Sequence, residues 1–525
     1  MEQTMDMRAP HTHFDMSSEH HHPHSHTDMQ PSTPPMPMEK APPASAGHNM
    51  HPDDPDNPQN APLFHKIHAS LSSSAFAFMI LFGATAYTSS LAGVQARFSV
   101  SMTVSILPFS LYFWGIAFAP IYTPHVSERY GRRPVYLVSL PLFAIFILGA
   151  SVSQSFAALC ITRFLAGLAG GPCVVLIEGT FADVWSAKTT VTYYVFLTCA
   201  SFVGAGAGAI VGNYIFVYGG WRWTQWITLI MAIGAYLLGV SMPETYPREI
   251  LRARAKRTKM PIKLAKAQSG VTLKEMATHT LINPVKMLVA EPIVILASWY
   301  VAFIFAVIFQ FFISIPVVLH LTYNFTPHQI AQAFTSAIIG TALAAFTATI
   351  IDLAPKLIRR ESCDMEGSPP MEVLEHRLRS GMLGGILITA SLFWIAWAAK
   401  PNIHYIAPIT GTAVFIWGCA LALTSIISYL FDAYPAPGTL AALTAAACFR
   451  IILAGLIPLV IIQMIMGLTG AWAVSTFAFI GAVGMGVPWV LYFFGAGMRR
   501  RSVYAAREMA EVGAGMGKEQ MGGSV

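Results

Sequence analysis

Three ionisable residues lie deep inside long apolar stretches of this sequence: Arg163, Glu178 and Arg450. A charge inside a membrane costs several kcal/mol, so such a residue is a candidate for function by default. A buried carboxylate suits proton transfer, because burial favours its protonated form. We therefore expect Glu178 and Arg163 to take part in proton coupling and Arg450 to line a substrate cavity. The alternative for each is a structural ion pair or a side chain that reaches the membrane surface.

Arg163 and Glu178 lie on the same apolar stretch, residues 157–181. If this stretch is a helix, the two side chains face roughly the same side and lie about 22 Å apart along its axis. We therefore expect them to act at different depths rather than on each other.

A short charged turn, Ser-Glu-Arg-Tyr-Gly-Arg-Arg-Pro at residues 127–134, separates two other apolar stretches. So short a turn makes the two helices antiparallel neighbours, and its charges could latch their junction. The candidate latch residues are Glu128, Arg129, Gly131, Arg132 and Arg133. Asp183, near the end of a later stretch, is the expected counter-charge, and we expect it to pair with Arg129.

Two further groups of residues predict close packing or a pocket. Gly204, Gly208 and Gly212 recur every four residues, a pattern that lets another helix approach closely. An aromatic stretch near residue 300 could line an apolar, polarisable pocket, although such residues also pack in cores. Its cavity candidates are Trp299, Tyr300, Phe303 and Gln310.

A histidine tract lies near the N-terminus, at His20, His21, His22, His24 and His26. Such tracts can chelate zinc, copper or nickel, but a tail without fixed geometry does not select a metal. The tract is therefore a weak candidate metal site, and we expect no cofactor.

The composition indicates a membrane protein. Only 11% of the 525 residues are charged and 54% are hydrophobic, whereas soluble proteins carry about 25% charged residues. The net charge of +6 resides mainly in short loops, so it indicates topology rather than a nucleic-acid partner. The sequence has no P-loop, HExxH motif or nucleophile elbow, which argues against an ATP-driven pump and against an enzyme.

Apolar stretches long enough to span a bilayer predict twelve helices. They cover roughly 72–94, 105–123, 135–153, 157–181, 191–214, 221–242, 292–320, 330–351, 381–399, 406–431, 438–466 and 471–496. The predicted organisation is a disordered His/Met/Pro-rich tail (1–68), a six-helix bundle (69–242), a central loop (243–291), a second six-helix bundle (292–497) and a C-terminal tail (498–525). Two bundles joined by a loop suggest alternating access to a midplane site.

The positions of lysine and arginine predict the orientation. With the N-terminal tail inside, the inward loops and C-terminal tail hold 24 such residues and the outward loops hold three: Arg97, Arg222 and Lys400. Because basic residues favour the cytoplasmic side, both termini and the central loop are predicted to be cytosolic. We expect a monomer in the plasma membrane.

Together these motifs resemble the major facilitator superfamily, specifically the fungal twelve-span drug:proton antiporters, over roughly residues 70–500. The matching segments are 127–134, 163–167 (Arg-Phe-Leu-Ala-Gly), 221–226 (Trp-Arg-Trp-Thr-Gln-Trp), 243–245 (Pro-Glu-Thr) and 429–434 (Tyr-Leu-Phe-Asp-Ala-Tyr). The resemblance implies that the charged turn stabilises an outward-facing state and that Arg163 takes part in proton transfer. The prolines usual in the family's fifth span are replaced by Ala205 and Ala209.

We therefore expect a proton-coupled exporter of amphiphilic drugs, toxins or secondary metabolites, in a fungal membrane. A polyamine exporter is an alternative, although Glu178 is the one deep carboxylate. An organic-acid exporter is another, with Arg163 or Arg450 as the anion partner. In a different class, the chain could be a non-transporting membrane sensor that reads metal through its histidine-rich tail.

Overall fold

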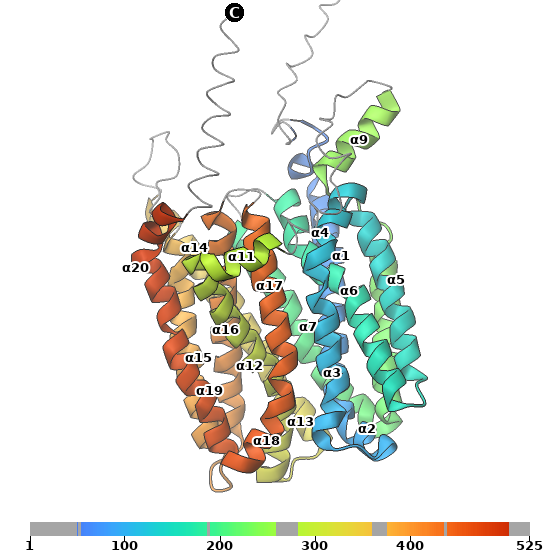
Figure 1. Cartoon of the computed structure of the whole chain (residues 1–525), viewed down its shortest axis with the longest axis vertical. Coiled ribbons are helices and arrows are strands. Elements are labelled where there is room, and N and C mark those ends of the chain that lie inside the picture. The colour runs from blue at the N-terminus through green and yellow to red at the C-terminus, as the bar shows by residue number, and fades with distance from the viewer. Residues whose placement is uncertain are drawn as a thin grey trace, which may run out of the picture. The chain divides into compact units, whose positions relative to one another are not determined.

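The computed structural model describes Met50 and residues 54–185, 190–258, 282–359, 375–434 and 438–502. All of them belong to one compact unit, Gly47–Val525. Over these residues the regular elements are helices (Figure 1), as the long apolar stretches predict.

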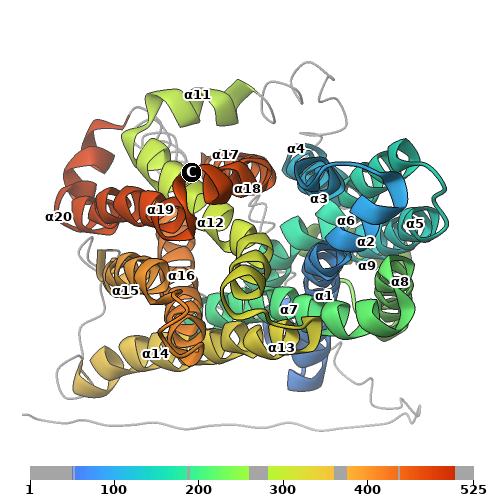
Figure 2. The same cartoon turned by 90° about the horizontal axis from the view of Figure 1, so that it is seen from below.

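Helices α1 to α8 form the first half of this unit and helices α12 to α20 form the second half, and Figure 2 shows the two groups side by side. The first half comprises α1 (Leu63–Ala86), η2 (Tyr87–Ser90), α2 (Leu91–Phe98), α3 (Met102–Ala117), α4 (Ala119–Tyr130), α5 (Arg132–Ser151), α6 (Phe156–Val184), α7 (Thr190–Gly219) and α8 (Trp221–Gly239). The second half comprises α12 (Pro292–Tyr323), α13 (Pro327–Ala333), α14 (Thr335–Arg359), α15 (Leu378–Ala398), α16 (Ile406–Ala433), α17 (Gly438–Leu456), α18 (Pro458–Leu468), α19 (Gly470–Gly484) and α20 (Gly486–Arg501).

Two shorter helices, α9 (Pro247–Thr258) and α11 (Asn283–Ala290), lie between the halves in sequence. Both lie at the same end of the long helices, which we call the α9 end, whereas α2, α13 and α18 lie at the opposite end, the α13 end (Figure 1). The predicted central loop, 243–291, therefore contains two helices.

Most of the predicted spans are helices that could cross a membrane. In the described part of the chain, nine helices are long and apolar enough, and eleven if each bent pair counts as one span. The bent pairs are α3 with α4, at 40°, and α17 with α18, at 44°. Helix α8 covers the predicted sixth span but is not among the eleven; its first turns carry Arg222, Thr224 and Gln225.

Glycines bring helices of the first half into close contact. A Cβ added at Gly208 would lie 2.4 Å from the Phe82 carbonyl oxygen of α1, and one at Gly204 would lie 2.6 Å from the Phe78 carbonyl oxygen. A Cβ at Gly167 would lie 2.0 Å from the Tyr112 carbonyl oxygen of α3. Contacts this close are possible only without a side chain, so these positions fix α7 against α1 and α6 against α3.

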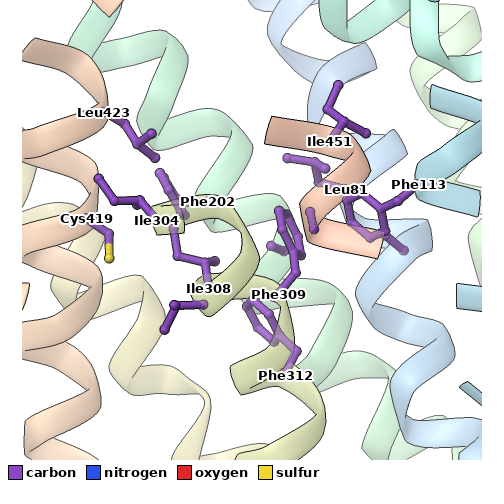
Figure 3. Packing of buried hydrophobic residues seen from close by; sticks show 14 of the residues in the cluster. Leu81, Phe113, Phe202, Ile304, Ile308, Phe309, Phe312, Cys419, Leu423 and Ile451 are labelled. Atoms are coloured by element: carbon purple, nitrogen blue, oxygen red, sulfur yellow. The ribbon is translucent and has the colours of Figure 1, made fainter. Parts of the chain in front are cut away.

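The two halves touch along two seams. Helix α3 packs against α17 and α18, and α7 packs against α13, α14 and α16. Between the seams, apolar side chains of both halves form one packed cluster (Figure 3), in which the rings of Phe113 and Phe309 lie 4.5 Å apart. Trp114 Nε1 donates to the Ile452 carbonyl oxygen at 3.3 Å, so polar contacts also cross this interface.

The ordered chain extends into the predicted tail. The sequence predicts that residues 1–68 are disordered. In the structure, α1 begins at Leu63 and a 3-10 helix covers Pro58–Asn60. Asp54 binds Arg254 of α9, with both carboxylate oxygens 3.1 Å from Nη1. A proline-rich, apolar-poor sequence suggests disorder, but Asp54 binds α9 and the 3-10 helix packs against α6. The histidine tract lies outside the described residues.

Candidate functional site

The central feature is an ion pair between the halves. Glu178 of α6 and Arg450 of α17 lie 3.6 Å apart, Oε1 to Nη2, with 22% and 11% of their side chains exposed. The Arg450 guanidinium also lies 5.0 Å from the ring centroid of Phe305 on α12. The pair is therefore only partly buried and joins the two halves.

A small apolar cluster, which we call the plug, includes a residue next to Glu178 in the sequence. The plug consists of Ala77 (α1), Ile177 and Phe181 (α6), and Ile427 (α16). Helix α6 therefore contacts the second half twice, α16 through the plug and α17 through the ion pair.

Arg163 lies apart from this site, inside the first half. It is fully buried between Tyr87 and Tyr112, at 4.4 and 5.5 Å from their ring centroids. Its Nη1 donates to the Gly83 carbonyl oxygen of α1 at 3.0 Å, while Nε and Nη2 have no hydrogen-bond partner among the described residues. Aromatic faces and a carbonyl dipole stabilise this cation in place of a carboxylate, and they fix α6 to α1.

The charged turn lies at the α9 end. Arg132 at the start of α5 forms an ion pair with Asp183 near the end of α6, and both side chains are about 15% exposed. The expected pairing of Asp183 with Arg129 is wrong, because Arg129 is exposed and its guanidinium lies over its own neighbour, Tyr130. Gly131 reverses the chain between α4 and α5 with a φ of +89°, which turns Arg132 inward.

Glu244 completes this turn, and the sequence reasoning assigned it no role. Its carboxylate accepts hydrogen bonds from the backbone N–H groups of Arg132 (2.9 Å) and Arg133 (3.1 Å), and from those of Thr245 and Tyr246. A carboxylate at a helix N-terminus satisfies free N–H groups and interacts favourably with the helix dipole. The Pro-Glu-Thr motif after the sixth predicted span was the available signal.

The second half carries corresponding ion pairs at the α9 end. Arg377, which precedes α15, binds Asp432 near the end of α16 at 2.6 Å. Arg499 of α20 binds Glu375 at 2.5 Å and the Tyr429 hydroxyl at 2.8 Å. Asp432 and Arg377 lie 55 residues apart in the sequence, so the sequence pattern does not reveal that they pair.

Two tyrosines at the α9 end have raised pKa values. Burial raises the pKa of Tyr434, and the Glu291 carboxylate raises it further, so the phenol donates to Glu291 Oε2 at 3.3 Å. Ser502 donates to the other oxygen of Glu291 at 3.0 Å. Burial also raises the pKa of Tyr246, whose ring lies 5.7 Å from the Arg132 guanidinium.

The predicted cavity residues of α12 face different directions. Trp299 is 57% exposed and packs edge-on against Phe449. Tyr300 is buried toward α15, where a Cβ at Gly385 would lie 3.2 Å from its hydroxyl. Gln310 is fully buried, and its amide has no hydrogen-bond partner among the described residues.

One aromatic side chain of α12 faces the first half: Phe309 lies against Phe113. Phe305 instead lies beside Arg450 of α17, within the second half. Phe303 packs near α19 instead, where a Cβ at Gly481 would lie 3.6 Å from its ring. In a helix that is aromatic on every side, composition does not reveal which face meets the other half.

The described residues contain no group of three or more histidines, cysteines, aspartates or glutamates that could hold a metal ion. The histidine tract falls outside those residues. The arrangement is therefore one of ion pairs and apolar contacts between movable halves.

Comparisons with known proteins agree with this architecture. The profile of the Major Facilitator Superfamily matches residues 72–449. The chain is 31% identical over 485 residues to "Polyamine transporter 4" of Saccharomyces cerevisiae, covering 87% of this chain and 73% of that protein. It is 30% identical over 486 residues to "Major facilitator-type transporter sor6" of Hypocrea jecorina, with coverage of 88% and 89%. It is 30% identical over 471 residues to "Efflux pump FUB11" of Gibberella moniliformis, with coverage of 87% and 77%.

Solved structures share the fold at low sequence identity. A crystal structure of a D-xylose-proton symporter gives a TM-score of 0.58 at 13% identity, covering 81% of this chain and 97% of that chain. The human organic anion transporter MFSD10 (TETRAN) gives 0.56 at 15% identity, with coverage of 82% and 100%. The chain therefore belongs to the major facilitator superfamily of membrane transporters.

Proposed function

We propose that this transporter exports amphiphilic small molecules in exchange for protons, by alternating access between its two halves. The observation that carries the proposal is the ion pair between Glu178 and Arg450, which joins the halves beside the apolar plug. A carboxylate in this position can exchange its counter-ion for a proton and thereby change the attraction between the halves.

The proposed cycle follows from the charges. We take the α9 end as cytosolic, because its loops hold most of the lysines and arginines. When ionised, Glu178 attracts Arg450 and holds the cytosolic side closed. Protonation of Glu178 from outside removes that attraction and favours opening toward the cytosol. The proton is then released to the cytosol. Substrate binding and closure of the cytosolic side return the carrier to its outward-facing state.

The remaining site residues have supporting roles in this proposal. The Arg132–Asp183 pair latches the cytosolic junction of the first half. Arg163 contributes to coupling through α1, since it binds Gly83 about two turns from Ala77 of the plug. The carrier works as a monomer in the plasma membrane with both termini in the cytosol.

Proteoliposomes that contain the purified full chain test the coupling. We expect an acid interior to drive uptake of rhodamine 6G, an amphiphilic dye, into vesicles. In Glu178→Gln, the factor by which the proton gradient stimulates dye uptake should fall at least about tenfold. This fall is equivalent to about 1.4 kcal/mol of lost coupling free energy. Glu249→Gln is the matched control, because Glu249 pairs with Arg252 on α9, away from the halves' interface. Gradient-driven uptake that is unchanged in Glu178→Gln would exclude this coupling role.

Polyamine export is the second candidate. It is favoured by the similarity to a yeast polyamine transporter and by the partial exposure of Glu178, which could receive an ammonium group once Arg450 has moved away. Competition separates the candidates: spermidine should inhibit dye uptake if polyamines are substrates, whereas neutral amphiphiles should inhibit it under the first proposal. Inhibition by succinate instead would indicate an organic-acid carrier.

A further inference from the structure

A cavity of about 380 Å³ lies inside the second half, at the α13 end. Helices α12, α13, α14, α15, α16, α18 and α19 contribute to its walls, which lie within residues 311–474. Of the residues that the structure describes, none from α1 to α8 lines it. It therefore lies within the second half and apart from the Glu178–Arg450 pair.

The walls are apolar. Buried side chains such as Phe311, Phe334, Ile395 and Val474 surround the space, and the described lining residues include no charged side chain. A charged ligand would lose its hydration here without compensation. The volume falls in the range of about 300–1,000 Å³ that is typical of pockets for small organic molecules.

One polar group in the wall lacks a partner. Ser336 is 3% exposed, and no described atom forms a hydrogen bond with its Oγ. It lies near the start of α14, directly after α13 ends at the break around Phe334. A buried hydroxyl without a partner is unfavourable, and rotation of the Ser336 side chain toward the cavity would let a ligand oxygen satisfy it.

The opening of the cavity is also apolar. Leu321 and Met466 line it and are 59% and 68% exposed. Thr469, in the same wall, has a φ of +70°, a conformation that β-branched residues rarely adopt. Exposed apolar side chains at the opening favour entry from the hydrocarbon phase of the bilayer over entry from water.

We propose that this cavity binds a neutral, mostly apolar molecule whose single hydroxyl or carbonyl oxygen forms a hydrogen bond with Ser336. The molecule enters from the bilayer past Leu321 and Met466. Its source is either a membrane lipid or a transported amphiphile, since both can share this chemistry. The site does not depend on the proposed coupling at Glu178.

Photolabelling of the purified full chain tests the site. The probe is a long-chain fatty alcohol that carries a diazirine and an alkyne, and excess unlabelled alcohol defines saturable labelling. We expect labelled peptides from the end of α12 and from α18 to α19. Ser336→Ala should reduce saturable labelling about fivefold. The control is Thr335→Ala, since the exposed Thr335 hydroxyl already donates to the Gln332 carbonyl oxygen at 2.6 Å.

A second variant fills the cavity. Ala396 lines it and is 2% exposed, so Ala396→Phe should abolish labelling. If Ala396→Phe does not elute as folded protein in size-exclusion chromatography, the result for Ser336→Ala alone tests the proposal. A lipid that co-purifies and is lost in Ala396→Phe identifies a membrane source, and competition by rhodamine 6G identifies a transported one. Labelling that is not saturable, or that is equal in Ser336→Ala and wild type, would overturn the proposal. Glu178→Gln should label normally, which separates this result from failure of the coupling proposal.

Discussion

Asp432 near the end of α16 binds Arg377, which precedes α15, at 2.6 Å. Asp183 near the end of α6 binds Arg132 at the start of α5 in the same manner. Each half therefore ties two of its helices together at the α9 end with one aspartate and one arginine. A pair of this kind fixes the angle between helices within a half, so that each half can move as a rigid body.

The first prediction concerns the Arg132–Asp183 pair. Arg132→Gln and Asp183→Asn should each reduce transport about tenfold, and the double variant should be no worse than the poorer single variant, because the second change removes a partner of a pair already broken. Initial rates in proteoliposomes measure this double-mutant cycle.

Arg129 provides the control for that cycle. It is exposed and contacts Tyr130, so Arg129→Gln should transport nearly as well as wild type. If Arg129→Gln is as defective as Arg132→Gln and shows the same non-additivity with Asp183→Asn, the assignment of the pair is wrong.

The second prediction concerns the cap of α5. Glu244→Ala leaves the N–H groups of Arg132 and Arg133 without their acceptor and should destabilise the protein by about 1–2 kcal/mol. Thermal unfolding in detergent, followed by a thiol-reactive dye, measures the change. Glu249→Ala, on α9, should unfold at nearly the wild-type temperature; equal losses in the two variants would show that charge, rather than capping, is responsible.

The third prediction concerns the contact between α7 and α1. A Cβ at Gly208 would lie 2.3 Å from Thr85 Oγ1 and 2.4 Å from the Phe82 carbonyl oxygen. Gly208→Ala should therefore destabilise the first half by about 1–3 kcal/mol through overpacking, measured by the same unfolding assay. Gly234→Ala is the matched control, since an added Cβ there meets no described atom within 4 Å. A stable Gly208→Ala variant would mean that the two helices can separate at little cost.

The fourth prediction concerns pH. Burial and Glu291 raise the pKa of Tyr434 in the folded state, so above the unfolded pKa, about 10, the folded chain binds more protons than the unfolded chain. Stability should then fall as pH rises beyond about 10. In Tyr434→Phe this fall should be shallower, although stability at neutral pH drops with the lost hydrogen bond. Unfolding temperatures measured between neutral pH and about pH 11 check both effects, and identical slopes would contradict the assignment.

The sequence alone determined the membrane class and most of the spans, because these follow from local composition, and short motifs such as residues 127–134 indicated the family. Length and apolarity suffice to predict a helix such as α12 or α16. The glycine spacing at 204, 208 and 212 predicted a close helix contact, but it did not identify α1 as the partner.

Tertiary structure decided which residues meet. It pairs Glu178 with Arg450 and Asp183 with Arg132 rather than Arg129, and it places Phe309 rather than Trp299 against the other half. The sequence of a helix that is apolar on every face has no periodic pattern that shows how the helix is rotated about its axis. Which of its residues contact the other half therefore depends on packing with neighbours far away in the sequence. The ion pairs depend on that same rotation, and hence only the folded chain reveals them.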